Sequence, residues 1–229
     1  MVTDDALPAE PAIPEGIREP FAVLKVEVTR LHYRWKVLKQ LYSETRRVEL
    51  LNTVASGFFG LDQEIWQDAI LLGISRVLDP NRDATSLRQL VRLASTKVRH
   101  DVVPELEKRL DRLDELVRVV DAHRDARISH IDAQYHPAAG GAALPLIYVS
   151  SLDELVAGIW ELMDAVGTAV GHPMKPYLEP LSDGDTLIYS LSKAARFNEI
   201  VPPVKWWEEL AQGRFGDLWP QKNEAQPWP

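Results

Sequence analysis

The apolar residues of this chain recur every three or four positions over most of its length, which is the spacing of amphipathic helices and not of strands. This periodicity predicts helices over 21–46, 48–78, 86–96, 102–134 and 151–170, with a short extended piece at 144–149. Helices of this length account for most of the central chain, so the sequence predicts an all-α fold.

Local signals predict how some of these helices are placed and where they end. The segment 48–78 carries apolar residues over most of its circumference, which predicts the most buried helix of the protein. Ser151, followed three residues later by Glu154, predicts a capping box at the start of the last long helix. Gly171 predicts the end of that helix.

The distribution of proline and charge divides the chain into three parts. Residues 1–17 are acidic and proline-rich, and we expect them to form a disordered leader. Residues 18–172 hold the long helices and are expected to form a bundle. Residues 173–229 are expected to form a C-terminal helical extension that packs on the bundle, with a loose tail from about 220.

Charge and composition exclude several classes of protein. The chain has 229 residues, a net charge of −8 and no cysteine, and it has no apolar run long enough to span a membrane. We therefore expect a cytoplasmic protein with no disulfide, signal peptide or membrane span. The central residues 21–178 carry 21 acidic and 20 basic side chains, which disfavours broad coating of nucleic acid but permits a local site for one phosphodiester. No cluster of His, Asp and Glu has metal-site spacing, so neither a metal nor another cofactor is expected.

One arginine occupies a position where an apolar residue is expected. The apolar residues of 102–134 form a single stripe along the predicted helix, and Arg124 lies at its centre. The stripe consists of Leu106, Leu110, Leu113, Val117, Val120, Ile128 and Ile131. An arginine in such a stripe is disfavoured unless its guanidinium is paired, lies in a cavity or faces another subunit. An ion pair with Asp68, on the helix at 48–78, is one structural explanation.

The residues that follow Arg124 suit the cleavage of RNA. Asp125, Arg127 and His130 lie within the next two helical turns. A histidine with a pKa near neutrality can take the proton from a ribose 2′-OH or give one to the departing 5′-oxygen. An arginine can bind the phosphate and neutralise the charge that develops on its oxygens. The expected products are a 2′,3′-cyclic phosphate and a 5′-OH.

The segment from Arg124 to His130, with the sequence RDARISH, resembles the R-x(4–6)-H motif of the HEPN superfamily of helical ribonucleases. More narrowly, the chain resembles the AbiU-type abortive-infection branch of that superfamily. The residues that carry this resemblance are Trp35, Leu41-Tyr42, Arg47–Asn52, Ser56–Phe59, Leu71–Asp79 and Arg127–Asp132. The resemblance covers about residues 30–172. It implies an up-and-down helical bundle that dimerises, with the motifs of two protomers forming one cleft.

We therefore expect a HEPN-like bundle that acts as a metal-independent endoribonuclease in bacterial phage defence or in a toxin–antitoxin system. In that role Arg124 binds the scissile phosphate, His130 transfers protons, and Asp125 and Arg127 support the site. The expected partners are an RNA substrate, a second copy of the chain, and an antitoxin or a nucleotidyltransferase. One alternative is a non-catalytic HEPN-like module that binds a nucleotide or a partner protein. A second is a purely structural protein in which Arg124 forms a buried ion pair.

The spacing of Arg124 and His130 raises a geometric question. On an ideal helix their side chains point about 120° apart. One protomer therefore brings both to one phosphate only if the helix is distorted there. Otherwise the two side chains come from different protomers of the dimer, and the sequence leaves both arrangements open.

Overall fold

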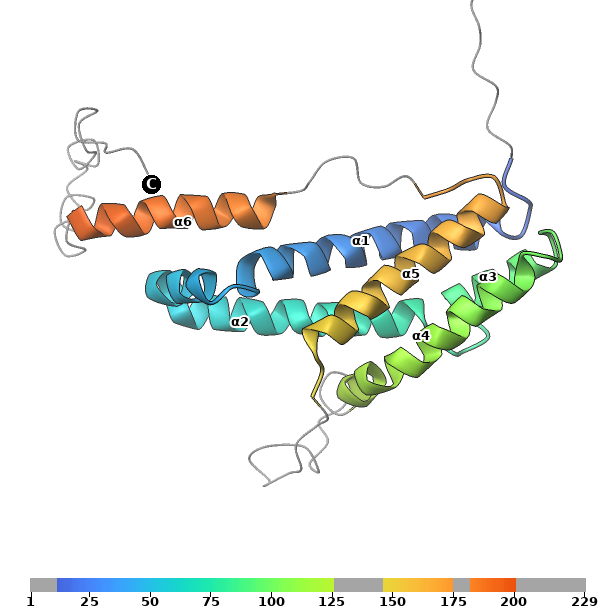
Figure 1. Ribbon diagram of the computed structural model, residues 1–229, viewed down its shortest axis with the longest axis horizontal. Coiled ribbons are helices and arrows are strands. Elements are labelled where there is room, and N and C mark those ends of the chain that lie inside the picture. Colours follow the sequence, from blue (N-terminus) through green and yellow to red (C-terminus); the bar gives the residue numbers. More distant parts are fainter. Residues whose placement is uncertain (1–11, 126–145, 175–181, 201–229) are drawn as a thin grey trace, which may run out of the picture. The chain divides into compact units, whose positions relative to one another are not determined.

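The computed structural model describes residues 12–125, 146–174 and 182–200, which contain six α-helices (Figure 1). They are α1 (Arg18–Tyr42), α2 (Thr45–Val77), α3 (Leu87–Ser95), α4 (Val103–His123), α5 (Val149–Ala169) and α6 (Asp183–Ile200). These ranges contain no strand, and the all-α prediction is confirmed. None of the helices in the described part of the chain is long and apolar enough to cross a membrane.

The helices are divided between two compact units. Unit 1 comprises the residues up to 39 together with 62–181, and unit 2 comprises 40–61 together with the residues from 182 onward. The boundary crosses α1 and α2, so each of these helices contributes to both units. The leader, bundle and C-terminal extension inferred from the sequence stay predictions, since much of 1–17 and 173–229 lies outside the described residues.

The core of unit 1 is formed by one apolar line on each of its helices. α4 packs against α5, and α3 packs against both (Figure 1). The large side chains that are almost completely excluded from solvent include Leu24 and Leu31 of α1, Ile70 and Ile74 of α2, Leu87 and Leu90 of α3, Leu106 and Leu113 of α4, and Leu155 and Ile159 of α5. Burial of each such side chain contributes about 1.5–3 kcal/mol relative to an exposed position.

The first turn of α5 differs from the prediction. The helix begins at Val149 with Tyr148 as its N-cap, and no side chain caps it, so the predicted capping box at Ser151 is wrong. The carbonyl oxygen of Tyr148 accepts from the backbone N–H of Ser151 at 3.0 Å, which places Ser151 inside the first turn. Glu154 forms an ion pair of 2.5 Å with Arg112 of α4. An ion pair between helices has therefore replaced the local contact that the sequence suggested.

The end of α5 follows the prediction. Gly171 has a positive φ of 81°, a backbone conformation that residues other than glycine rarely adopt. The backbone N–H of His172 donates to the carbonyl oxygen of Gly167 at 2.7 Å, and that of Gly171 donates to Thr168 at 3.1 Å. These two bonds form a Schellman motif, which satisfies two carbonyl groups at the end of the helix.

The prediction that α2 is the most buried helix is wrong. After a bend at Ala55, the buried residues Phe59, Ile70, Ile74 and Val77 share one face, whereas Phe58, Leu61, Ile65 and Leu72 share the opposite face. Phe58, Leu61 and Ile65 of that second face are exposed at 65%, 57% and 58%. The apolar residues of α2 encircle the helix, but among the described residues only those on one side of it are buried.

In unit 2, a group of polar contacts connects the start of α6 with α2 and the end of α1. Arg47 Nη1 donates to Asp185 Oδ1 at 2.6 Å, and Gln40 Nε2 donates to Asp185 Oδ2 at 3.1 Å. The backbone N–H of Gly184 donates in turn to Gln40 Oε1 at 3.2 Å. Glu44 also pairs with Arg47, at 3.3 Å. The guanidinium of Arg47 is thus held between two carboxylates.

In unit 1, a half-buried histidine lies between α1 and α5. His32 Nε2 is 2.9 Å from the carbonyl oxygen of Val156, and its ring meets the ring of Trp160 edge-on with centroids 4.8 Å apart. Burial lowers the pKa of His32, the hydrogen bond to Val156 opposes this, and the charge of Lys39 lowers the pKa further. The net effect places the pKa below the usual range of histidine.

This lowered pKa predicts a specific pH dependence of stability. Because unfolded His32 binds a proton more readily than folded His32, the free energy of unfolding should fall as the pH drops through about 6.5. His32→Gln keeps a hydrogen-bond donor near Val156 but does not titrate. Between pH 7.5 and 5.5, its free energy of unfolding should therefore fall by less than that of the wild type. Urea unfolding at several pH values measures this difference, with the exposed His100→Gln as the matched control. Parallel pH profiles for wild type and His32→Gln would show that the effect is absent.

The Schellman motif leaves no room for a side chain at Gly167. A Cβ there would lie 2.3 Å from the carbonyl oxygen of His172 and 3.2 Å from Phe21. We expect Gly167→Ala to lower the free energy of unfolding by about 2 kcal/mol. Gly60→Ala on α2 is the matched control, because its Cβ meets nothing within 4 Å and should raise stability by up to ~1 kcal/mol. Equal urea midpoints for the two variants would contradict this account of the α5 end.

Candidate functional site

Arg124 continues the buried line of α4 past the end of the regular helix. Leu106, Leu113, Val117 and Val120 of the predicted stripe are buried. Arg124 follows them, and its side chain is only 26% exposed. The described part of the stripe therefore lies as predicted, with the arginine half-buried at its end; Ile128 and Ile131 lie outside the described residues.

The helix changes its geometry at this arginine. Arg124 and Asp125 are π-helical, in contrast to the α-helical turns that precede them. A π-helical turn holds more residues than an α-helical one, and such turns are often found at functional sites. His130 and Arg127 lie outside the described residues, so the site as described contains Arg124 and Asp125 but not these two.

Two carboxylates from the same end of α4 pair with the guanidinium. Nε and Nη2 of Arg124 lie 2.8 Å and 2.7 Å from Asp125 Oδ1, and Nη1 lies 3.3 Å from Asp121 Oδ1. The suggested ion pair between Arg124 and Asp68 is therefore wrong. The reason is local: an arginine at a helix end reaches the carboxylates one residue ahead and one turn behind before it reaches a neighbouring helix.

These carboxylates maintain the positive charge of the arginine. Burial alone would lower the pKa of Arg124, but the hydrogen bond with Asp125 and the charges of Asp121, Asp125 and Asp79 together raise it. Asp79 follows the end of α2, so the acidic surroundings of Arg124 come from two parts of the chain. Arg124 is thus a permanent cation in a half-buried place, which suits the binding of an anion.

A residue of α2 also takes part in this site, although no sequence pattern predicted it. Ser75 is 3% exposed, and its Oγ donates to Asp121 Oδ1 at 2.9 Å. The signals were present in the sequence: Asp121 lies three residues before Arg124, and Ser75 is a polar residue in the apolar segment of α2. That the two would meet depends on how α2 and α4 pack, which no local pattern shows.

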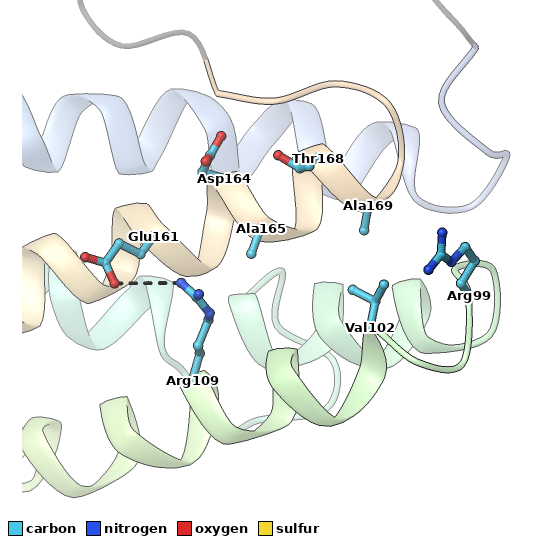
Figure 2. A pocket seen from close by; sticks show the side chains of 8 residues that line it. All are labelled: Arg99, Val102, Arg109, Glu161, Asp164, Ala165, Thr168 and Ala169. Carbon is cyan, nitrogen blue, oxygen red and sulfur yellow. Dashed lines mark ion pairs between the residues drawn. The ribbon is translucent and has the colours of Figure 1, made fainter.

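A separate pocket of about 530 Å³ lies between α4 and α5, away from Arg124 (Figure 2). Arg109 points across it toward Glu161, at 3.7 Å, and also pairs with Glu105 at 2.9 Å. Arg99, at the rim, pairs with Asp101. The basic side chains of this pocket thus already face carboxylates. Elsewhere in the described segments, no group of three or more His, Asp or Glu side chains is arranged to hold a metal ion.

The fold and this site define the class of the protein: an all-α domain with a half-buried arginine at a distorted helix end. The chain belongs to the AbiU2 family of HEPN domains, whose family model matches residues 16–185. It is thus an abortive-infection HEPN domain, as the resemblance suggested. The match is longer than the expected 30–172 and extends to Asp185 in α6. No curated protein and no solved structure matches the chain.

Proposed function

We propose that this protein is a metal-independent endoribonuclease of bacterial phage defence or of a toxin–antitoxin system. The observation that carries the proposal is Arg124, a half-buried permanent cation at a π-helical helix end, in a HEPN-family chain. His130 follows it six residues later. This is the residue pair that the proposed chemistry requires.

The proposed reaction is an internal transfer of the phosphate. The 2′-oxygen of the ribose attacks the phosphorus, and the bond to the 5′-oxygen breaks, which leaves a 2′,3′-cyclic phosphate and a 5′-OH. A base removes the proton from the 2′-OH and an acid protonates the leaving oxygen, and His130 serves in one or both of these transfers. Arg124 binds the phosphate and stabilises the charge on its oxygens, with Arg127 in a supporting role. Asp125 supports the site by holding the guanidinium of Arg124 while no phosphate is bound.

The contacts of Arg124 do not support a role in stability alone. In the part of the chain that the structure describes, Arg124 pairs with two carboxylates of its own helix end, so these pairs do not join α4 to another helix. Partly exposed pairs of this kind contribute about 0–1 kcal/mol. A half-buried arginine that contributes so little to stability is better explained by the binding of an anion.

The described site needs further positive charge before it can bind RNA. Arg124, Asp121 and Asp125 together carry a net charge of −1, which would repel RNA unless further cations approach. Arg127 and His130 of the motif, from the same or from a second protomer, would supply them. A homodimer that assembles one site from two motifs therefore fits both the charge and the family.

An exposed apolar surface close to the site could hold that second copy. In unit 1, Ile65 and Leu72 of α2 are exposed at 58% and 36%. They lie on one face of the helix, and the exposed Arg76 follows them one turn later, next to Ser75. An exposed apolar surface with charged residues at its edge is typical of protein interfaces. We expect α2 to form part of the dimer interface.

Cleavage of RNA in the presence of EDTA tests the proposed activity. Wild-type protein should cut RNA and leave 2′,3′-cyclic phosphate ends, whereas Arg124→Ala and His130→Ala should each lower the rate by about 100-fold or more, since each removes a group that acts on the reacting phosphate. Arg118→Ala and His100→Ala, both at exposed positions, are matched controls and should cleave like wild type.

Two results would overturn the proposed ribonuclease activity. Cleavage that persists in both Arg124→Ala and His130→Ala would place the reaction elsewhere. Saturable RNA or nucleotide binding without any cyclic-phosphate product, by folded and dimeric protein, would favour the non-catalytic binding module.

The dimer interface can be tested by placing one charge in it. Ile65→Asp should convert the dimer to a monomer, because a carboxylate would be buried against an apolar surface without a partner. Sedimentation velocity measures the change, and Val26→Asp on α1, where the native residue is 48% exposed, is the matched control. A dimer that persists in Ile65→Asp would exclude this part of α2 from the interface.

A further inference from the structure

Ser75 is a buried polar residue that does not cap a helix. Among the described residues, the buried polar side chains are Ser75 and Ser86. Ser86 is explained by its role as the N-cap of α3, where its side chain accepts from the backbone N–H of Gln89. Ser75 lies within α2 and donates to the carboxylate of Asp121 at 2.9 Å. A buried hydroxyl that donates to a carboxylate on another helix fixes where that carboxylate lies.

Asp121 passes this constraint on to Arg124. The same oxygen that accepts from Ser75 lies 3.3 Å from Arg124 Nη1. A chain of contacts thus runs from Ser75 on the buried face of α2 through Asp121 to Arg124. These contacts hold the guanidinium of Arg124 at its Nη1 atom.

The opposite edge of the guanidinium is held differently. Nε and Nη2 form the edge that binds a carboxylate or phosphate with two parallel hydrogen bonds. Asp125 Oδ1 accepts from Nε at 2.8 Å and forms an ion pair with Nη2 at 2.7 Å. Its side chain is 62% exposed, compared with 35% for Asp121. Asp125 can therefore turn into solvent at lower cost than Asp121, which would have to leave the hydroxyl of Ser75.

We propose that Asp121, held by Ser75, is a positioning residue for Arg124, and that the phosphate binds the Nε–Nη2 edge in place of Asp125. This proposal rests on the proposed function and specifies how the arginine of the same site is used. Asp121 fixes the guanidinium, and Asp125 competes with the phosphate. The two acids beside Arg124 thus have opposite effects on phosphate binding.

Asp121→Asn and Asp125→Asn form a charge-matched pair for testing this. Each removes one negative charge next to Arg124, so a purely electrostatic effect would strengthen phosphate binding in both. The proposal predicts about tenfold tighter binding for Asp125→Asn and no gain for Asp121→Asn. Ser75→Ala changes no charge and should weaken phosphate binding several-fold, whereas Ser75→Thr keeps the hydroxyl and should bind like wild type.

The measurement follows the Nε–H resonance of Arg124 by NMR, assigned from its absence in Arg124→Lys, during titration with inorganic phosphate. Rates of RNA cleavage are measured on the same proteins. Ser75→Ala should lower kcat about tenfold with little change in KM, because a displaced arginine stabilises the transition state less well. Asp111→Asn and Ser95→Ala, on the same and on a neighbouring helix, are the matched controls. Circular dichroism confirms that each variant is folded.

Three results would overturn the proposal. The first is an equal gain in phosphate affinity in Asp121→Asn and Asp125→Asn. The second is phosphate affinity and kcat in Ser75→Ala that equal those of the wild type. The third is an Arg124 resonance that does not respond to phosphate in any variant. If the wild-type protein cleaves no RNA, the proposed function fails by itself. The phosphate titration then still decides whether Asp121 and Ser75 position Arg124, because it does not depend on cleavage.

Discussion

Compensation of the Arg124 charge is the interaction on which the rest of the site depends. α4 buries one apolar line against α3 and α5, and Arg124 continues this line where the helix becomes π-helical. A guanidinium does not lose its proton in a protein, so its half-buried charge has to be met by carboxylates. Asp121 and Asp125 do this directly, and Ser75 connects Asp121 to α2. The ends of α2 and α4 therefore meet through a group of polar contacts.

Features that depend on residues close in sequence could be predicted from the sequence. The apolar stripe of α4 and the position of Arg124 on it follow from helical periodicity. The end of α5 follows from one glycine, because Gly171 adopts the positive φ that the Schellman motif requires. In both cases the physical cause lies within one or two helical turns, so packing against other helices did not alter the outcome.

Features that depend on packing between helices could not be predicted. Glu154 pairs with Arg112 of α4 and does not cap α5, and several apolar residues of α2, among them Phe58 and Ile65, are exposed. The contact between Ser75 and Asp121 joins residues 46 positions apart. Asp68 was a plausible partner for Arg124 by composition, but Asp121 and Asp125 are closer along the chain and take that place. Composition shows which charges need partners, whereas packing decides which residues become partners.

In the proposed reaction, Arg124 acts on an RNA that supplies its own nucleophile, the ribose 2′-OH. The most direct test uses an RNA with one preferred cleavage position and a second RNA that carries a 2′-deoxy nucleotide at that position only. We expect the wild-type protein, in EDTA, to bind both RNAs with similar affinity and to cut only the first. Cleavage of the 2′-deoxy substrate at an undiminished rate would contradict the proposed reaction, because the phosphate would then be attacked by water and not by the neighbouring hydroxyl.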